Sequence, residues 1–249
     1  MATKMKVNMS MIDLTEKRTR TIFLLLFLGF IILFVGCKHR ESTSTVLRDK
    51  SFYVEEISDE LFAKMQGKTY KENCTVPRDD LRYLHVLHIN FNGQEQEGEL
   101  VCNKVIANDL LDIFKDLYEA GYEIEKIRLM DEYDADDETA MRDNNSSCFN
   151  FRFISHTTIV SKHGLGVAVD INTLYNPYIK EVNGEQILEP ATAGDYVDRS
   201  KDFPHKIDEN DLCYQLFLKH GFEWGGAWPD RKDYQHFELP DSVIKDLGL

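Results

Sequence analysis

Residues 161–170 read S-K-H-G-L-G-V-A-V-D, which begins as a predicted loop and ends as a predicted β-strand. Every second residue of the strand is apolar: Leu165, Val167, Val169 and Ile171. This alternation places Gly166, Ala168 and Asp170 together on the other face. The small side chains leave space in front of Asp170, and a buried carboxylate needs a charge partner such as a metal ion. His163 lies in the glycine-bearing loop, from which its imidazole can fold back beside Asp170.

A second group of candidate ligands lies near the C-terminus, where W-G-G-A-W at 224–228 precedes D-Y-Q-H-F-E at 233–238. It supplies a second imidazole, His236, and two further carboxylates, Asp233 and Glu238. Two histidines and one aspartate leave a tetrahedral zinc ion one open position for water, as in catalytic zinc sites. A separate carboxylate can then act as general base and deliver a proton to a leaving amine.

Both motifs resemble those of a family of bacterial cell-wall zinc metallopeptidases, the D-alanyl-D-alanine carboxypeptidases and L-alanyl-D-glutamate endopeptidases. The motif S-x-H-x-x-G-x-A-x-D is matched at every fixed position, by Ser161, His163, Gly166, Ala168 and Asp170. The motif carboxylate-x-x-His is matched by Asp233 and His236, and W-G-G-x-W by Trp224, Gly225, Gly226 and Trp228. Similar stretches at 143–152 and 175–178 extend the likeness over residues 62–239.

The resemblance implies that His163, Asp170 and His236 bind one zinc ion per chain. It also implies that Asp233 is the general base and that Arg152 holds the substrate carbonyl or its oxyanion, where a fixed cation is effective. Three alternatives stay open: a turn-forming role for Asp233, Glu238 as a rival base, and an ion pair between Arg152 and the acidic run at 131–138. Ala227 stands where relatives often have a polar residue, which leaves the substrate rim undefined. Of Trp224 and Trp228, we expect at most one to border the cleft.

The rest of the pattern predicts an α+β fold with a small, largely antiparallel sheet and flanking helices. The predicted elements are a hairpin of 81–91 and 99–102 with an Asn92-Gly93 turn, helices over 105–120 and 209–220, and a short strand within 122–130. Asp208 is the expected N-cap of the second helix. The six acids within 131–138 lack the spacing of an EF-hand, which favours a solvated loop over a calcium site. The resemblance implies the fold shared by hedgehog-type proteins and DD-peptidases, with zinc in a surface cleft.

The first 36 residues predict an export signal of the lipoprotein type. Five basic residues precede an apolar run at 22–36, which is too short for an ordinary spanning helix, and Cys37 follows it. Cys37 is then the lipidated first residue of the mature chain, residues 37–54 are a polar tether, and residues 55–249 are the peptidase domain. The alternative is an uncleaved membrane anchor. Both place the domain outside the cytoplasm, in the cell envelope and attached to a membrane.

The composition of the predicted exported part limits the classes of partner that it can bind. The 249-residue chain has a formal net charge of -14, and the leader has five basic and two acidic residues, so residues 37–249 have a net charge of -17. Such acidity argues against nucleic acid as a partner. Cys74, Cys102, Cys148 and Cys213 are either paired or small buried side chains. The six histidines outside the motifs are predicted to be surface residues: His39, His85, His88, His156, His205 and His220.

The predicted function is that of an envelope-anchored zinc peptidase acting on the peptide stem of peptidoglycan. A carboxypeptidase would remove a terminal D-Ala, and an endopeptidase would cut between L-Ala and D-Glu. The motifs W-G-G-x-W and D-x-x-H together resemble the endopeptidase branch of the family slightly more than the carboxypeptidase branch. The alternative is a non-catalytic zinc-bearing module that binds wall peptides or a protein partner, since one fold hosts several functions.

Overall fold

The structure, a computed structural model, describes residues 51–154 and 157–249. A compact unit begins at Ser51 rather than at the predicted residue 55, because Tyr53–Glu56 (β1) pairs with the following strand. The predicted signal, Cys37 and most of the tether lie outside the described residues. Among the helices of the described residues, none is long and apolar enough to cross a membrane.

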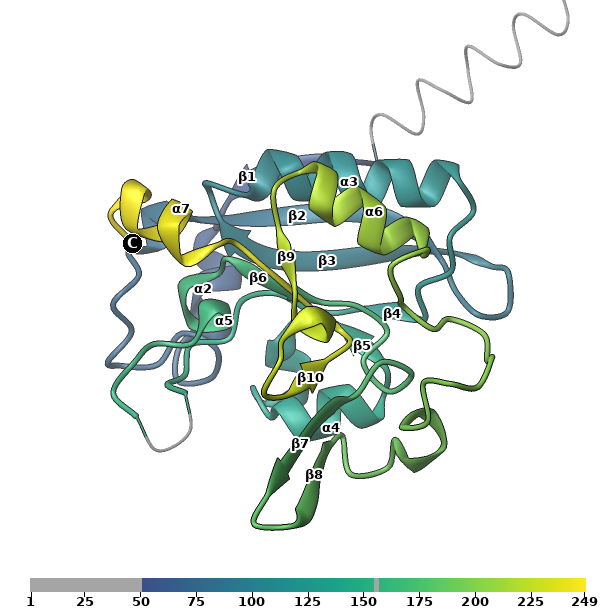
Figure 1. Cartoon of the computed structure of the whole chain (residues 1–249). Helices are drawn as coiled ribbons and strands as arrows, with labels where there is room; N and C mark the ends of the chain where they lie inside the picture. Colours follow the sequence, from purple (N-terminus) through teal and green to yellow (C-terminus); the bar gives the residue numbers. More distant parts are fainter. Residues whose placement is uncertain (1–50, 155–156) are drawn as a thin grey trace, which may run out of the picture. The chain divides into compact units, whose positions relative to one another are not determined.

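The first sheet is antiparallel in the order β1-β2-β3, with β2 at Leu81–Ile89 and β3 at Glu95–Asn103. It confirms the predicted hairpin, whose turn places Gly93 at a φ of 70°. Helix α3 (Ala107–Glu119) covers one face of this sheet, as Figure 1 shows. Its buried stripe, which includes Leu110, Ile113 and Phe114, belongs to the main core. The first sheet contributes Leu84 and Val86 of β2 and Leu100 of β3 to the same core.

The second sheet is formed by three short strands in the order β6-β11-β9, all antiparallel. Their bounds are Ala168–Asp170 (β6), His236–Glu238 (β11) and Glu223–Trp224 (β9). Helix α6 (Leu212–Lys219) packs against it, and the Phe217 ring stacks on the Phe237 ring of β11 with centroids 4.3 Å apart. The N-cap of α6 is Asp211 rather than the predicted Asp208, since the Asp211 side chain accepts a hydrogen bond from the Cys213 amide.

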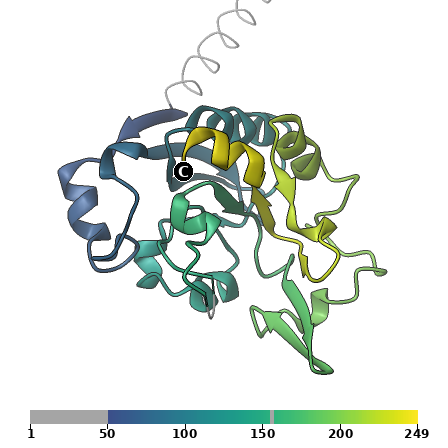
Figure 2. The ribbon, with the colours of Figure 1, turned by 60° about the vertical axis from the view of Figure 1, so that its left-hand side comes forward.

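A third sheet has the order β10-β7-β8, from Lys232–Asp233 (β10), Tyr178–Val182 (β7) and Glu185–Glu189 (β8). The β7–β8 hairpin extends away from α3 in both Figure 1 and Figure 2. Its turn is Asn183-Gly184, in which both residues have positive φ angles, as a two-residue hairpin turn requires. Two further strands pair in parallel, β4 (Lys126–Ile127) and β5 (Asn145–Ser146).

Four helices complete the described chain: α2 (Asp59–Met65), α4 (Asp137–Arg142), α5 (Lys162–Leu165) and α7 (Asp241–Leu247). The fold is therefore a mixed α/β arrangement with small antiparallel sheets, as expected. The predicted strand within 122–130 is reduced to β4, because the single-turn 3-10 helix Met130–Tyr133 ends it.

The acidic run at 131–138 is largely accessible to solvent, as predicted, but it is not an irregular loop. It contains the 3-10 turn and the start of α4, whose N-cap Asp136 accepts a hydrogen bond from the Thr139 amide. Asp131 is buried and accepts a 2.7 Å hydrogen bond from Thr69 Oγ1. Burial raises the pKa of Asp131 in spite of this bond. The run is thus built into the fold through local capping and one buried side chain.

Two further sequence expectations concern cysteine and histidine. All four cysteines of the described residues are free thiols, and only Cys74 is partly exposed. The surface assignment is wrong for His88, which is 4% exposed and has its Nδ1 2.7 Å from the Ile124 carbonyl oxygen. His39 and His156 lie outside the described residues.

Candidate metal centre

His163 is positioned by a short helix rather than by the predicted loop. The Ser161 side chain caps α5 by accepting a hydrogen bond from the His163 amide, and Gly166 ends it at a φ of 72°. A β-carbon at Gly166 would lie 2.7 Å from the Asn103 amide nitrogen, so this position has no room for a side chain. The buried His163 ring places Nδ1 2.7 Å from the Cys148 carbonyl oxygen. Because a carbonyl only accepts, Nδ1 donates to it and Nε2 faces the site.

The pairing of β6 with β11 brings the other two candidate ligands together, with His236 directly opposite Asp170. His236 Nδ1 lies 3.0 Å from Asp170 Oδ1 and 3.1 Å from His163 Nε2. His163 Nε2 lies 3.2 Å from Asp170 Oδ2. Among the described residues, these three form a group that could hold a metal ion, with candidate ligand atoms within 4.8 Å of one another. The structure therefore brings together the predicted ligand set.

The outer nitrogen of His236 has its own partner. Nε2 lies 2.9 Å from Glu238 Oε2. Burial raises the pKa of Glu238, but the hydrogen bond from His236 and the nearby Lys162 lower it below its ordinary value. The ionised carboxylate only accepts, so Nε2 carries the hydrogen and Nδ1 faces Asp170 and His163.

The inward-facing atoms fit a cation better than they fit a proton. Without metal, burial lowers the pKa of His236, but hydrogen bonds to Asp170 and Glu238 outweigh this and raise it to about 10. Burial raises the pKa of Asp170, and the two imidazoles more than reverse this and hold it well below its usual range. One proton on His236 still leaves the lone pair of His163 Nε2 facing a carboxylate oxygen. A zinc ion with bonds of about 2.0–2.1 Å would separate tetrahedral ligands by roughly 3.3–3.4 Å, close to the spacings found.

The predicted base, Asp233, lies on β10 beside this group. Its Oδ1 atom is buried and has no hydrogen-bond partner in the described part of the chain. Burial raises the pKa of Asp233 to about 7, with His236 and His163 lowering it and Asp170 raising it. A carboxyl group with this pKa is suited to exchanging protons near neutral pH.

The absence of a side chain at Gly225 lets Asp233 and His236 lie close together. A β-carbon at Gly225 would lie 2.7 Å from the Asp233 carbonyl oxygen, 2.8 Å from its Cβ and 3.3 Å from His236 Cβ. The W-G-G-A-W stretch therefore supplies the space that these two side chains need. Trp228 borders the site, with its ring 5.4 Å from the His236 ring, whereas Trp224 is a core residue whose Nε1 donates to the Tyr234 carbonyl oxygen.

Arg152 forms the ion pair that was the alternative to its predicted role. Its Nε atom lies 2.6 Å from Asp137 Oδ2, at the start of α4. Its Nη1 atom also lies 3.4 Å from Ser161 Oγ, the cap of the helix that carries His163. Arg152 is thus beside α5 but is paired with an acid, and contact with substrate stays a prediction.

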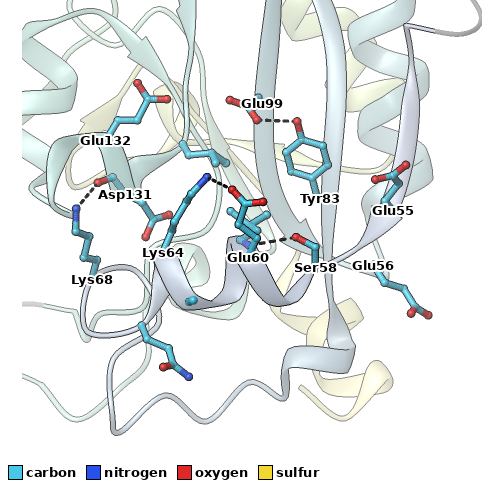
Figure 3. Close-up of a pocket in the computed structure, with 14 residues that line it drawn as sticks. Glu55, Glu56, Ser58, Glu60, Lys64, Lys68, Tyr83, Glu99, Asp131 and Glu132 are labelled. Carbon is cyan, nitrogen blue, oxygen red and sulfur yellow. Dashed lines mark hydrogen bonds and ion pairs between the residues drawn. The ribbon is translucent and has the colours of Figure 1, made fainter.

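A cavity of 690 Å³ lies between α2 and the first sheet, and Figure 3 shows the residues around it. Tyr83 donates a hydrogen bond to Glu99 on one wall, and Lys64 pairs with Glu60 on another. None of the candidate metal ligands lines this cavity. It is therefore separate from the metal centre.

Three convergent ligands beside a buried carboxylate define a candidate hydrolytic metal centre. Residues 155–239, which contain all four of these side chains, match the protein-family model described as D-alanyl-D-alanine carboxypeptidase. This match covers one segment of the chain and confirms the resemblance carried by the motifs. Searches of curated proteins and of solved structures found no match.

Proposed function

We propose that this chain is a zinc-dependent peptidase that hydrolyses the peptide stem of peptidoglycan, at either the D-Ala-D-Ala or the L-Ala-D-Glu bond. The observation that carries the proposal is the convergence of His163 Nε2, Asp170 and His236 Nδ1 beside Asp233. The family match over the same segment supports peptidase activity.

The proposed chemistry uses the site residues in distinct roles. His163, Asp170 and His236 would hold the zinc ion, which would lower the pKa of a bound water molecule and polarise the substrate carbonyl. Asp233 accepts a proton from the water as the water oxygen bonds to the carbonyl carbon. It then delivers this proton to the leaving amine as the carbon–nitrogen bond breaks. The Trp228 ring provides an apolar wall beside the reacting peptide. The Nε atom of Arg152 is paired with Asp137, so the other nitrogens of its guanidinium group would have to contact the substrate oxygen.

The test of this function is mass spectrometry of a pentapeptide muropeptide incubated with the full-length chain in detergent, with zinc or with a chelator. Loss of a terminal D-Ala would show a carboxypeptidase, and cleavage between L-Ala and D-Glu an endopeptidase. Both activities should disappear with chelator and in His163→Ala. An unchanged muropeptide in the presence of folded, zinc-loaded protein would contradict the proposal and favour a non-catalytic binding module.

We also propose that the domain is exported and held at a membrane by lipid on Cys37. The support is the sequence of residues 1–37 alone: a basic flank, an apolar run at 22–36 and a cysteine at its end. Wild-type chain should incorporate labelled palmitate in a bacterial host, and Cys37→Ser should not. Equal labelling of the two would contradict lipidation at Cys37.

A further inference from the structure

We infer that Glu238 is a positioning residue for the metal site, and that Lys162 holds it in place. The inference rests on the proposed zinc site and goes beyond its ligands and base. It assigns a function to a carboxylate whose sequence position alone suggests a rival base.

The contact between Glu238 and His236 follows from strand geometry. Residues 236 and 238 of β11 point to the same face, since side chains alternate along a strand. Glu238 Oε2 lies 2.9 Å from His236 Nε2, the nitrogen on the side away from Asp170 and His163. Glu238 has a side chain that is only 13% exposed, so little water competes for this hydrogen bond.

This contact selects the nitrogen that is available to a metal. A neutral imidazole carries one hydrogen, and the acceptor at one nitrogen determines which nitrogen keeps it. Glu238 keeps the hydrogen on Nε2 and leaves the Nδ1 lone pair for the metal. The Cys148 carbonyl oxygen does the reverse at His163, where it keeps the hydrogen on Nδ1 and leaves Nε2 free. The two ligands therefore offer different nitrogens, each set by an acceptor behind the ring.

Lys162 connects the elements that carry the two histidines. It precedes His163 in α5, and its ammonium group lies 3.3 Å from Glu238 Oε1 and donates a 3.0 Å hydrogen bond to the Leu239 carbonyl oxygen. The same ammonium group lies 2.5 Å from Oδ1 of the exposed Asp241. The Lys162 side chain is 19% exposed. One cation thus holds α5 against the end of β11 and occupies the Glu238 oxygen that His236 does not use. A base acting on water would need a free oxygen, and both oxygens of Glu238 have partners.

The test is the zinc dissociation constant of the full-length chain, measured by competition with a chromophoric chelator. Glu238→Ala should weaken zinc binding by about 10–100-fold, the usual effect of losing a partner behind a metal-bound histidine. Glu238→Gln keeps an acceptor for Nε2 and should recover most of this loss. Lys162→Met should weaken binding by less than Glu238→Ala. Glu223→Ala is the matched control, since exposed Glu223 lies opposite Glu238 on β9 and should leave binding within about twofold.

A spectroscopic readout separates positioning from general stability. In the zinc-loaded chain, long-range nitrogen–proton NMR spectra should show the His236 hydrogen on Nε2, and Glu238→Ala should lose this signal or populate the other tautomer. Unchanged zinc affinity and tautomer in folded Glu238→Ala would overturn the inference, as would an equal loss in Glu223→Ala. These measurements need no substrate, so failure of peptide hydrolysis would contradict the proposed function without touching this inference.

Discussion

His236 lies directly opposite Asp170 in the antiparallel pairing of β11 with β6, and the two side chains meet at 3.0 Å. The strand register therefore assembles two of the three candidate ligands. A shift of one residue would turn the His236 side chain to the other face of the sheet. Stacking of Phe237 on Phe217, and the packing of both in the core, work against such a shift. The site thus depends on the core directly behind it.

Zinc binding should release at least one proton per chain at pH 8. The pKa of His236 without metal is raised to about 10, so its ring is protonated at this pH and must give up the Nδ1 hydrogen to bind zinc. The measurement is isothermal titration calorimetry in two buffers with different ionisation enthalpies. Identical binding enthalpies in the two buffers would show that no proton is released and that His236 is not the group displaced.

Asp233→Asn should lower kcat by about 10²–10⁴-fold, the usual contribution of a general base, and should leave zinc bound. The base acts only when deprotonated, so activity should fall as the pH drops through its pKa. That pKa is about 7 without metal, and a nearby cation lowers it, which places the acidic limb of kcat/KM at or below pH 7. A limb that persists unchanged in Asp233→Asn would assign it to another group.

Gly225→Ala should reduce kcat/KM by about 10–100-fold. The added methyl group overlaps the Asp233 backbone and would move the Asp233 carboxylate away from His236. Gly194→Ala is the matched control, since a β-carbon there meets no atom within 4 Å. Both variants would be assayed on the same muropeptide after their folding is checked by circular dichroism. Equal activity of the two variants would show that the tight contact at Gly225 does not position the base.

Phe237→Ala should lower the free energy of unfolding by about 3–5 kcal/mol, the typical cost of removing a buried phenylalanine. Phe237 is fully buried and lies next to His236 on β11. Val243→Ala, on the 38% exposed Val243 of α7, should change it by no more than about 0.5 kcal/mol. Urea unfolding of the metal-free protein measures both. A loss below 1 kcal/mol for Phe237→Ala would mean that β11 is not anchored by this packing.

The sequence predicts the ligand set because its chemistry is local. His163 and Asp170 occur within one short motif, Asp233 and His236 within another, and the small residues between them have direct steric reasons. The β2–β3 hairpin and α3 were also predictable, since each has a clear period and a turn or stop residue. The β7–β8 hairpin was missed, although Asn183-Gly184 is a typical hairpin turn.

Other features depend on contacts between distant segments and were not predictable. The burial of Asp131 depends on Thr69, and the pairing of Arg152 depends on Asp137 in a separate helix. Glu238 looked like a rival base because β-strand alternation gives its face but not its partners, which are His236 and the distant Lys162. The α5 turn was predicted as a loop, although Ser161 and Gly166 are typical cap residues.

The most direct test of the metal centre is anomalous X-ray scattering at the zinc absorption edge, from crystals of the chain grown with zinc. The account predicts one strong peak per chain, bonded to His163 Nε2, an Asp170 carboxylate oxygen and His236 Nδ1, with Glu238 still on His236 Nε2. Well-ordered density for these side chains with no peak between them, or a peak bonded to other residues, would contradict it.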